Sequence, residues 1–272
     1  MGTSTPSAGP TGSRTPLIPS WLDDTDPGEH ADGDSAPPPP EGEPDRFKAS
    51  RSSFSRFARS GGRDRASLGR SVAGYVSRTA GGPRNAARRM GASRTAGTRL
   101  LGFLGDAAAR GVDQALRSLN LSQLADRPLT EIFKGLADYV CPEGGDDDKS
   151  IARDAFFDTL TDITEAGITD LADLTAGEVR TIFELFVTHT IERRLFNDVG
   201  TRAISLPADV EAINDIQAQV HDFIAGGVAD AVTAIGGILP DLAGERLPGF
   251  VDDVYESAFR LLAAMGEAEA DK

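Results

Sequence analysis

The chain has 272 residues, 39% of them hydrophobic and 6% aromatic, which is enough for one large or two small domains. Its single cysteine, Cys141, excludes an internal disulfide and a cysteine-rich zinc site, and it suits a reducing compartment. No apolar run long enough for a membrane span or a signal peptide is present, and Pro6 breaks the myristoylation pattern. These features predict a soluble, cytoplasmic protein without membrane contact.

The net charge of −14 hides a strong asymmetry along the chain. Residues 1–45 carry one basic and nine acidic side chains, and residues 46–110 carry fifteen basic and two acidic ones. Residues 111–272 carry twelve basic and thirty-one acidic side chains. Because opposite charges attract, the basic segment either lies on the acidic part of the same chain or serves a partner.

Residues 1–45 hold ten of the sixteen prolines and a single aromatic residue, Trp21. This composition predicts a disordered acidic tail that ends in a short polyproline spacer. A short apolar motif at 16–22 is the only part of the tail expected to dock by itself. Its apolar side chains are Leu17, Ile18, Trp21 and Leu22.

The first residues of the tail are small and polar. A Met1 that precedes a glycine, here Gly2, is normally removed. Gly2 would then be the first residue, with a free amine and no side chain to hinder entry into a narrow active site. The pKa of a terminal amine, about 7.7–8.0, makes it a usable nucleophile at cellular pH. We expect Thr3, Ser4, Thr5 and Pro6 to follow Gly2 into a partner. The alternative is an ordinary frayed terminus.

Residues 46–119 form a basic arm rich in Arg, Gly, Ser and Ala. Within it, Phe47, Phe54 and Phe57 lie among arginines, a combination that can bind single-stranded nucleic acid by phosphate pairing and base stacking. The alternative is a linker that lies along a partner or along the chain's own acidic surface.

The arm is predicted to end in a long helix from Pro83 to Leu119, because proline suits a first helical turn and apolar residues then recur every three or four positions. Glycines at 91, 97, 102 and 105 weaken this helix and indicate either close helix approach or a break. Arg88, Arg99 and Arg110 recur every eleven residues and would form one stripe on this helix. The stripe is either an interface or a solvated face. The candidate basic interface comprises Arg84, Arg88, Arg89, Arg94, Arg99 and Arg110.

Residues 120–272 are predicted to form an acidic domain built of helices, with few strand signals. Ser150 is a candidate helix cap, Thr175 and Glu178 fit a capping box, and Pro207 is expected to open another helix. The predicted fold is therefore all-α: a helical bundle with a long disordered N-terminal tail and a basic, partly helical arm.

Catalytic motifs are scarce. His189 and His221 lie on predicted helices without a metal-binding motif. Each is therefore interpreted as a polar surface residue or as a core residue whose hydrogen bonds are satisfied, and no metal or cofactor is expected. One helix face carries three carboxylates, Asp154, Asp158 and Asp162. We interpret them as a solvated acidic stripe, or as a docking surface for the arginine stripe, rather than as a cation site. The sequence predicts a protein that is not an enzyme.

Two stretches resemble a known family. They are Met1-Gly2-Thr3-Ser4 followed by Pro16-Leu17-Ile18-Pro19-Ser20-Trp21-Leu22, and the small, arginine-studded run from Arg78 to Gly91 with its continuation to Leu104. Both are similar to the B proteins of bacterial Qat anti-phage systems, the QatB family. The resemblance covers about the first 105 residues.

The resemblance implies a role and partners. Qat systems pair the B protein with an ATPase (QatA), a QueC-like enzyme (QatC) and a TatD-like nuclease (QatD), of which QatC is the expected partner. A QueC-like enzyme activates a deazaguanine carboxylate with ATP and aminates it, so the resemblance implies attachment of a deazaguanine to Gly2. The alternative function is a nucleic-acid scaffold, in which residues 46–110 recruit DNA or RNA to the system's nuclease or ATPase.

Overall fold

The computed structural model describes residues 45–144, 147–168, 170–171, 174–200, 210–236 and 244–272, which all lie in one compact unit. The described residues form helices and no strand, so the prediction of an all-α fold is confirmed. All of the tail residues singled out above, from Gly2 to Leu22, lie outside the described residues.

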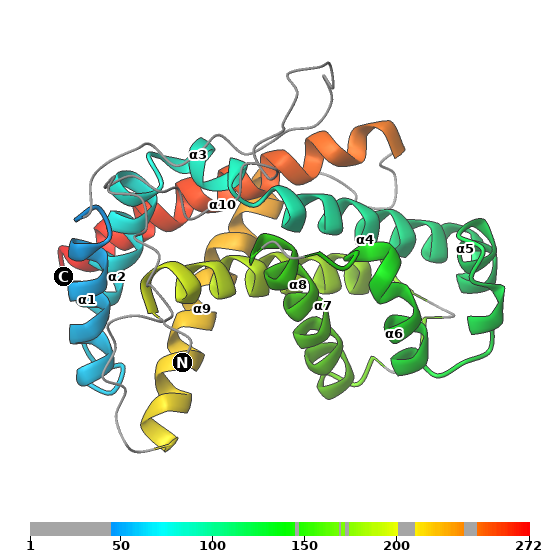
Figure 1. Cartoon of the computed structure of the whole chain (residues 1–272), viewed down its shortest axis with the longest axis horizontal. Helices are drawn as coiled ribbons and strands as arrows, with labels where there is room; N and C mark the ends of the chain where they lie inside the picture. Colours follow the sequence, from blue (N-terminus) through cyan, green and yellow to red (C-terminus); the bar gives the residue numbers. More distant parts are fainter. Residues whose placement is uncertain (1–44, 145–146, 169, 172–173, 201–209, 237–243) are drawn as a thin grey trace, which may run out of the picture. The chain divides into compact units, whose positions relative to one another are not determined.

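The first half of the described chain consists of several short helices and one long one, α4 (Figure 1). They are α1 (Lys48–Arg59), α2 (Arg65–Gly74), a π-helical turn η2 (Tyr75–Thr79), α3 (Pro83–Arg88), α4 (Gly91–Arg110), α5 (Val112–Ser118) and the 3₁₀ turn η3 (Ser122–Leu124). The predicted boundary between residues 119 and 120 falls between α5 and η3 and stays a prediction. Helices from both sides of it contribute to the same core.

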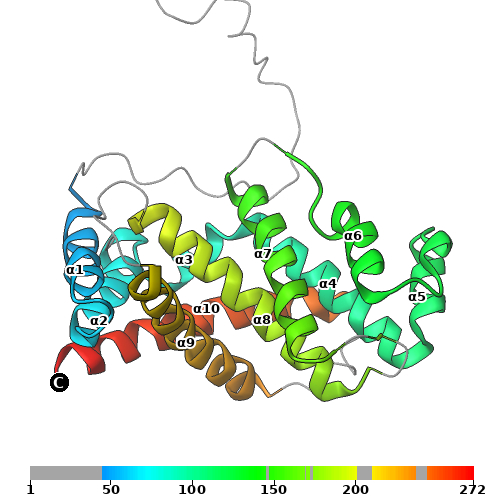
Figure 2. The ribbon, with the colours of Figure 1, turned by 90° about the horizontal axis from the view of Figure 1, so that it is seen from below.

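Longer helices make up the second half (Figure 2). They are α6 (Leu129–Val140), α7 (Asp147–Glu165), α8 (Ala176–Leu195), the π-helical turn η4 (Phe196–Gly200), α9 (Val210–Ile235), the 3₁₀ turn η6 (Gly244–Arg246) and α10 (Leu247–Ala270). The expected helix start at Pro207 lies outside the described residues. None of the described helices is long and apolar enough to cross a membrane.

Helix α8 is the centre of the bundle and contacts α4, α7 and α9. Five consecutive residues, Val187 to Ile191, are all buried, so α8 is covered on every side rather than on one apolar stripe. Its start is the predicted capping box: the Thr175 hydroxyl accepts from the Glu178 amide, and the Glu178 carboxylate accepts from the Thr175 amide. This cap confirms the sequence-based prediction.

The predicted helix from Pro83 to Leu119 is wrong as a single element. Pro83 does open a helix, but α3 ends at Arg88, and Arg89 and Met90 separate it from α4. A second break follows at Gly111, whose φ of 86° is a conformation that glycine adopts without the steric penalty of a side chain. Arg88 is therefore on α3 while Arg99 and Arg110 are on α4, and the predicted stripe is divided between two helices.

The prediction of Ser150 as a helix cap is also wrong, because α7 begins three residues earlier, at Asp147. Asp147 and Asp148 occupy its first turn, where carboxylates interact favourably with the helix dipole. Asp148 also accepts hydrogen bonds from the Ala92 amide (2.6 Å) and the Ser93 hydroxyl (3.0 Å), which joins the starts of α7 and α4.

The aromatic residues of the basic arm are not available for stacking on bases. Phe54 and Phe57 are 1% and 0% exposed, because α1 turns both of them toward the core. Phe54 packs edge-on against Phe196 of η4, with ring centroids 5.7 Å apart. Phe47 is half-buried, and the guanidinium groups of Arg46 and Arg51 lie over its ring. The predicted base-stacking role of these rings is therefore corrected to a structural one.

Helix α2 packs closely against the last turns of α10. Gly69 and Gly266 face each other there, and a Cβ atom built on Gly266 would lie 2.6 Å from the Gly69 carbonyl oxygen. The absence of side chains at these two positions allows the two backbones to approach.

Candidate functional site

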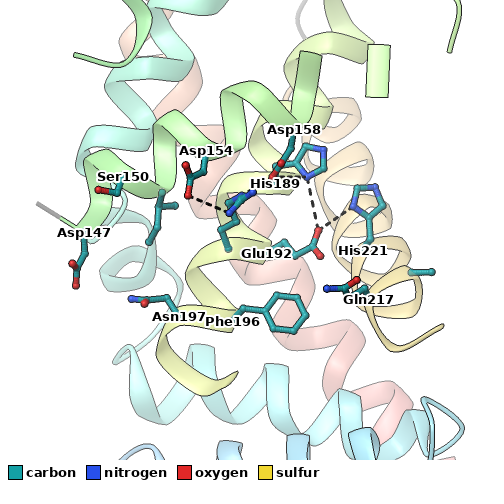
Figure 3. A pocket seen from close by; sticks show the side chains of 13 residues that line it. Asp147, Ser150, Asp154, Asp158, His189, Glu192, Phe196, Asn197, Gln217 and His221 are labelled. Atoms are coloured by element: carbon teal, nitrogen blue, oxygen red, sulfur yellow. Dashed lines mark hydrogen bonds and ion pairs between the residues drawn. The ribbon is translucent and has the colours of Figure 1, made fainter. Parts of the chain in front are cut away.

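A pocket of about 680 Å³ lies between α7, α8 and α9 and contains both histidines of the described residues (Figure 3). Its lining residues come from three helices and η4. They are Asp147, Ser150, Ile151, Asp154, Asp158, His189, Glu192, Arg193, Phe196, Asn197, Gln217, Ala218 and His221.

The acidic stripe of α7 forms one wall of this pocket. Arg193 of α8 donates from Nε to Asp158 Oδ2 (2.5 Å) and from Nη1 to Asp154 Oδ2 (3.3 Å). The hydrogen bond with Asp158 raises the pKa of Arg193 above its ordinary value. Asp154 and Asp158 therefore pair with Arg193, and Asp162 pairs with His189. None of the three predicted stripe arginines appears among the described partners of these carboxylates.

His189 and His221, separate in sequence, converge on Glu192. The Nδ1 atom of His221 lies 3.0 Å from Glu192 Oε2, and Nδ1 of His189 lies 4.0 Å from the same oxygen. The hydrogen bond with Glu192 raises the pKa of His221. On the opposite edge of the His189 ring, Nε2 lies 2.7 Å from Asp162 Oδ2. Figure 3 shows both imidazoles directed toward the Glu192 carboxylate.

His189, which is buried and hydrogen-bonded to Asp162, fits the interpretation as a satisfied core residue. The packing of α8 on α9 adds that both histidines lie beside Glu192. One part of the cluster could have been found from the sequence: His189 and Glu192 are three residues apart and must share a helix face. The position of His221 depends on how α9 lies against α8, which the sequence pattern does not specify.

The six predicted interface arginines fall into different environments. Arg94 pairs with Asp252 of α10 (2.7 Å), Arg99 donates to the Tyr139 carbonyl of α6 (3.1 Å), and Arg110 pairs with Asp106 one turn before it.

The remaining three arginines lie in and just after α3. Arg84 and Arg88 are exposed, whereas Arg89 is half-buried and its pKa is lowered by burial. Of the six, Arg84 and Arg88 therefore remain most available to a partner.

Cys141 is not a candidate nucleophile. The side chain is 3% exposed, and burial raises the pKa of its thiol to about 12. Because the thiolate is the reactive form, this cysteine stays unreactive near neutral pH.

Comparison with known proteins decides the family. A family model described as "QatB: Qat anti-phage system associated protein QatB" matches residues 81–262, about two thirds of the chain. The chain belongs to the QatB family. As a QatB family member it is a component of a Qat anti-phage system, which comprises further proteins. Neither a curated protein nor a solved structure gives a significant match.

The QatB match runs from just before α3 into α10 and includes the whole pocket between α7, α8 and α9. Helices α1 and α2 precede the matched residues. The tail, with the predicted modification site at Gly2, precedes them too.

Proposed function

We propose that this QatB family member is a non-catalytic substrate and adaptor, which presents the amine of Gly2 to the QueC-like enzyme of its system. The observation that carries the proposal is the tail itself: a removable Met1, then Gly2 and small polar residues, with an apolar anchor at 16–22. Membership of the QatB family, a component of Qat anti-phage systems, supports it, because the resemblance implies that such systems include a QueC-like enzyme that acts on a deazaguanine.

The proposed reaction forms an amide. The partner first activates the carboxylate of a deazaguanine with ATP. The lone pair of the Gly2 nitrogen attacks the activated carboxyl carbon, the leaving group departs with its bonding electrons, and the amine loses a proton. A glycine is suited to this reaction because it adds no Cβ beside the nucleophile. We place the reaction in the cytoplasm, where ATP is available.

The motif at 16–22 would dock the tail on the partner. An apolar anchor that contains Trp21 can supply binding energy, while the small residues Thr3, Ser4, Thr5 and Pro6 follow Gly2 into the active site. The ATPase and the nuclease of the system are further candidate partners.

The test is an intact-mass measurement after incubation of the full chain with the QueC-like enzyme, ATP and a deazaguanine carboxylic acid. We expect the mass of that acid minus one water on the first peptide. Gly2→Leu, prepared by proteolytic cleavage so that the substituted position is the first residue, should lose the addition. Gly9→Leu, the same change farther along the tail, should be modified normally. Equal modification of both variants, or none of the unaltered chain, would count against the proposal.

A second function is favoured by one observation. Eight arginines between residues 56 and 88 are exposed, and among the described ion pairs only Arg65 and Arg70 of these eight have an acidic partner. They are Arg56, Arg59, Arg63, Arg65, Arg70, Arg78, Arg84 and Arg88. Exposed arginines that pair with phosphates would recruit nucleic acid to the system's nuclease or ATPase.

Binding of this kind is expected to weaken steeply with salt, because each phosphate contact releases a counterion. The measurement is a filter-binding titration of single- and double-stranded DNA and RNA at several salt concentrations. The double variant Arg84→Ser with Arg88→Ser should show a shallower salt dependence than Arg94→Lys, which keeps a cation beside Asp252. Affinity that does not depend on salt would rule this function out.

A further inference from the structure

The pocket between α7, α8 and α9 contains a group of side chains whose donor atoms converge. One ring nitrogen of His189, one ring nitrogen of His221 and one carboxylate oxygen of Glu192 all lie within 4.8 Å of one another. The exposed fractions of these side chains are 11%, 29% and 14%, so all three are held partly out of solvent. We propose that His189, Glu192 and His221 bind one divalent transition-metal ion of the zinc class.

The distances between the donor atoms suit such an ion. Zinc binds histidine nitrogen and carboxylate oxygen at about 2.0–2.2 Å, which in a tetrahedral site places neighbouring donors roughly 3.4 Å apart. The separations from Glu192 Oε2 to the two Nδ1 atoms are 3.0 Å and 4.0 Å. These two separations bracket the expected value, and the third pair of donor atoms lies within 4.8 Å.

Asp162 sets the protonation of the His189 ring. Its Oδ2 atom is 2.7 Å from Nε2 of His189, and an ionised carboxylate accepts hydrogen bonds only, so Nε2 carries the proton. In the neutral ring Nδ1 then has a free lone pair directed toward Glu192. A carboxylate that holds the far nitrogen of a ligating histidine is the usual arrangement in metal sites.

The charges around the three residues also favour a cation. Arg193 is the one basic side chain that lines the described pocket besides the histidines, and Asp154 and Asp158 neutralise it. Glu192 and Asp162 contact the two imidazoles, and Asp158 Oδ2 also lies 4.0 Å from Nδ1 of His189. A bound cation would therefore meet net negative charge.

The donor set selects the class of metal. Two imidazole nitrogens and one carboxylate suit zinc and related transition metals, whereas Mg²⁺ and Ca²⁺ prefer sites made of oxygen alone. Three protein ligands leave one coordination position for water or another ligand from the open pocket. Because His189 and Glu192 come from α8 and His221 from α9, the ion would also cross-link these two helices.

The test is calorimetric titration of the full, untagged and EDTA-treated chain with Zn²⁺, with Mg²⁺ as the comparison. We expect one Zn²⁺ per chain, a higher unfolding temperature with Zn²⁺, and no effect of Mg²⁺. Substitution of Co²⁺ should give visible absorption bands of a low-coordinate site. Asp162→Asn should weaken Zn²⁺ binding by about 10- to 100-fold, and His221→Gln should weaken it more.

The third histidine of the chain supplies a matched control. His30 lies in the tail, and His30→Gln should bind Zn²⁺ as the unaltered chain does. Circular dichroism in EDTA checks that each variant is folded. Absence of one-to-one Zn²⁺ binding by the unaltered chain would overturn the proposal without any variant, as would equal affinity in His221→Gln. Neither outcome bears on modification of Gly2, so this proposal fails or stands independently of the proposed function.

Discussion

Asp198→Ala is expected to lower the free energy of unfolding by about 3 kcal/mol, because it removes one partner of a largely buried charged network. The Asp198 carboxylate accepts from the Tyr75 hydroxyl (2.8 Å) and from Nε of Arg194 (3.2 Å). The side chains of Asp198 and Arg194 are only 13% and 17% exposed. Alanine would leave the Arg194 guanidinium and the Tyr75 hydroxyl without this acceptor inside the protein.

Loss of the Asp198 side chain would weaken the contacts between several helices. Tyr75 belongs to η2, Arg194 to α8 and Asp198 to η4, while Arg51 of α1 donates to the Asp198 carbonyl (2.9 Å). Burial raises the pKa of Tyr75, which keeps its hydroxyl protonated as a donor at neutral pH. This network therefore fastens the basic N-terminal helices to the central helix.

Asp106→Ala is the matched control, since it removes the same side chain from an exposed pair with Arg110 one turn away. Such a surface pair contributes at most about 1 kcal/mol. Denaturant unfolding of both variants, with midpoint and slope compared, measures the difference. Equal stability of Asp198→Ala and Asp106→Ala would show that the buried network contributes no more than a surface pair.

Gly266→Ala is expected to destabilise the protein by about 1–3 kcal/mol, although alanine is ordinarily the better residue in a helix. The new Cβ would lie 2.6 Å from the Gly69 carbonyl oxygen and 3.0 Å from the Ala73 nitrogen, which are both backbone atoms. Backbone atoms cannot move aside as a flexible side chain can, so α2 and α10 must separate.

Gly249→Ala, in the first turns of the same helix, provides the comparison. A Cβ built on Gly249 meets nothing within 4 Å, so this variant should be neutral or more stable by up to about 1 kcal/mol. Thermal and denaturant unfolding distinguish the two variants by the sign of the change. A gain in stability in both would mean that the helices do not approach as closely as described.

Much of the fold could be predicted from the sequence, because helices signal their apolar period and their caps locally. The capping box of Thr175 and Glu178 could be predicted for this reason. Failures occurred where the decisive contact was distant in sequence. In the sequence, Phe54 and Phe57 resemble exposed aromatic residues among arginines. In the structure both are buried, and Phe54 packs against Phe196, which is 142 residues later in the chain.

The candidate site shows the same limit. The two imidazoles are separated by 32 residues, and part of the intervening segment lies outside the described residues. No local pattern relates His221 to His189, so the cluster appears only once α9 is placed beside α8. The predicted role of Gly2 is of another kind, since it depends on a partner and not on the fold.

Helix α8 continues into η4 without a break, so Glu192 and Asp198 belong to one continuous helical segment, six residues apart near its C-terminal end, and contact different partners. Glu192 is directed to the pocket and Asp198 to the N-terminal helices. One residue of an α-helix corresponds to a rotation of about 100°. A single insertion or deletion between the two would therefore turn one of them away from its partners, and we expect chains of this kind to keep the spacing constant even where the residues between differ.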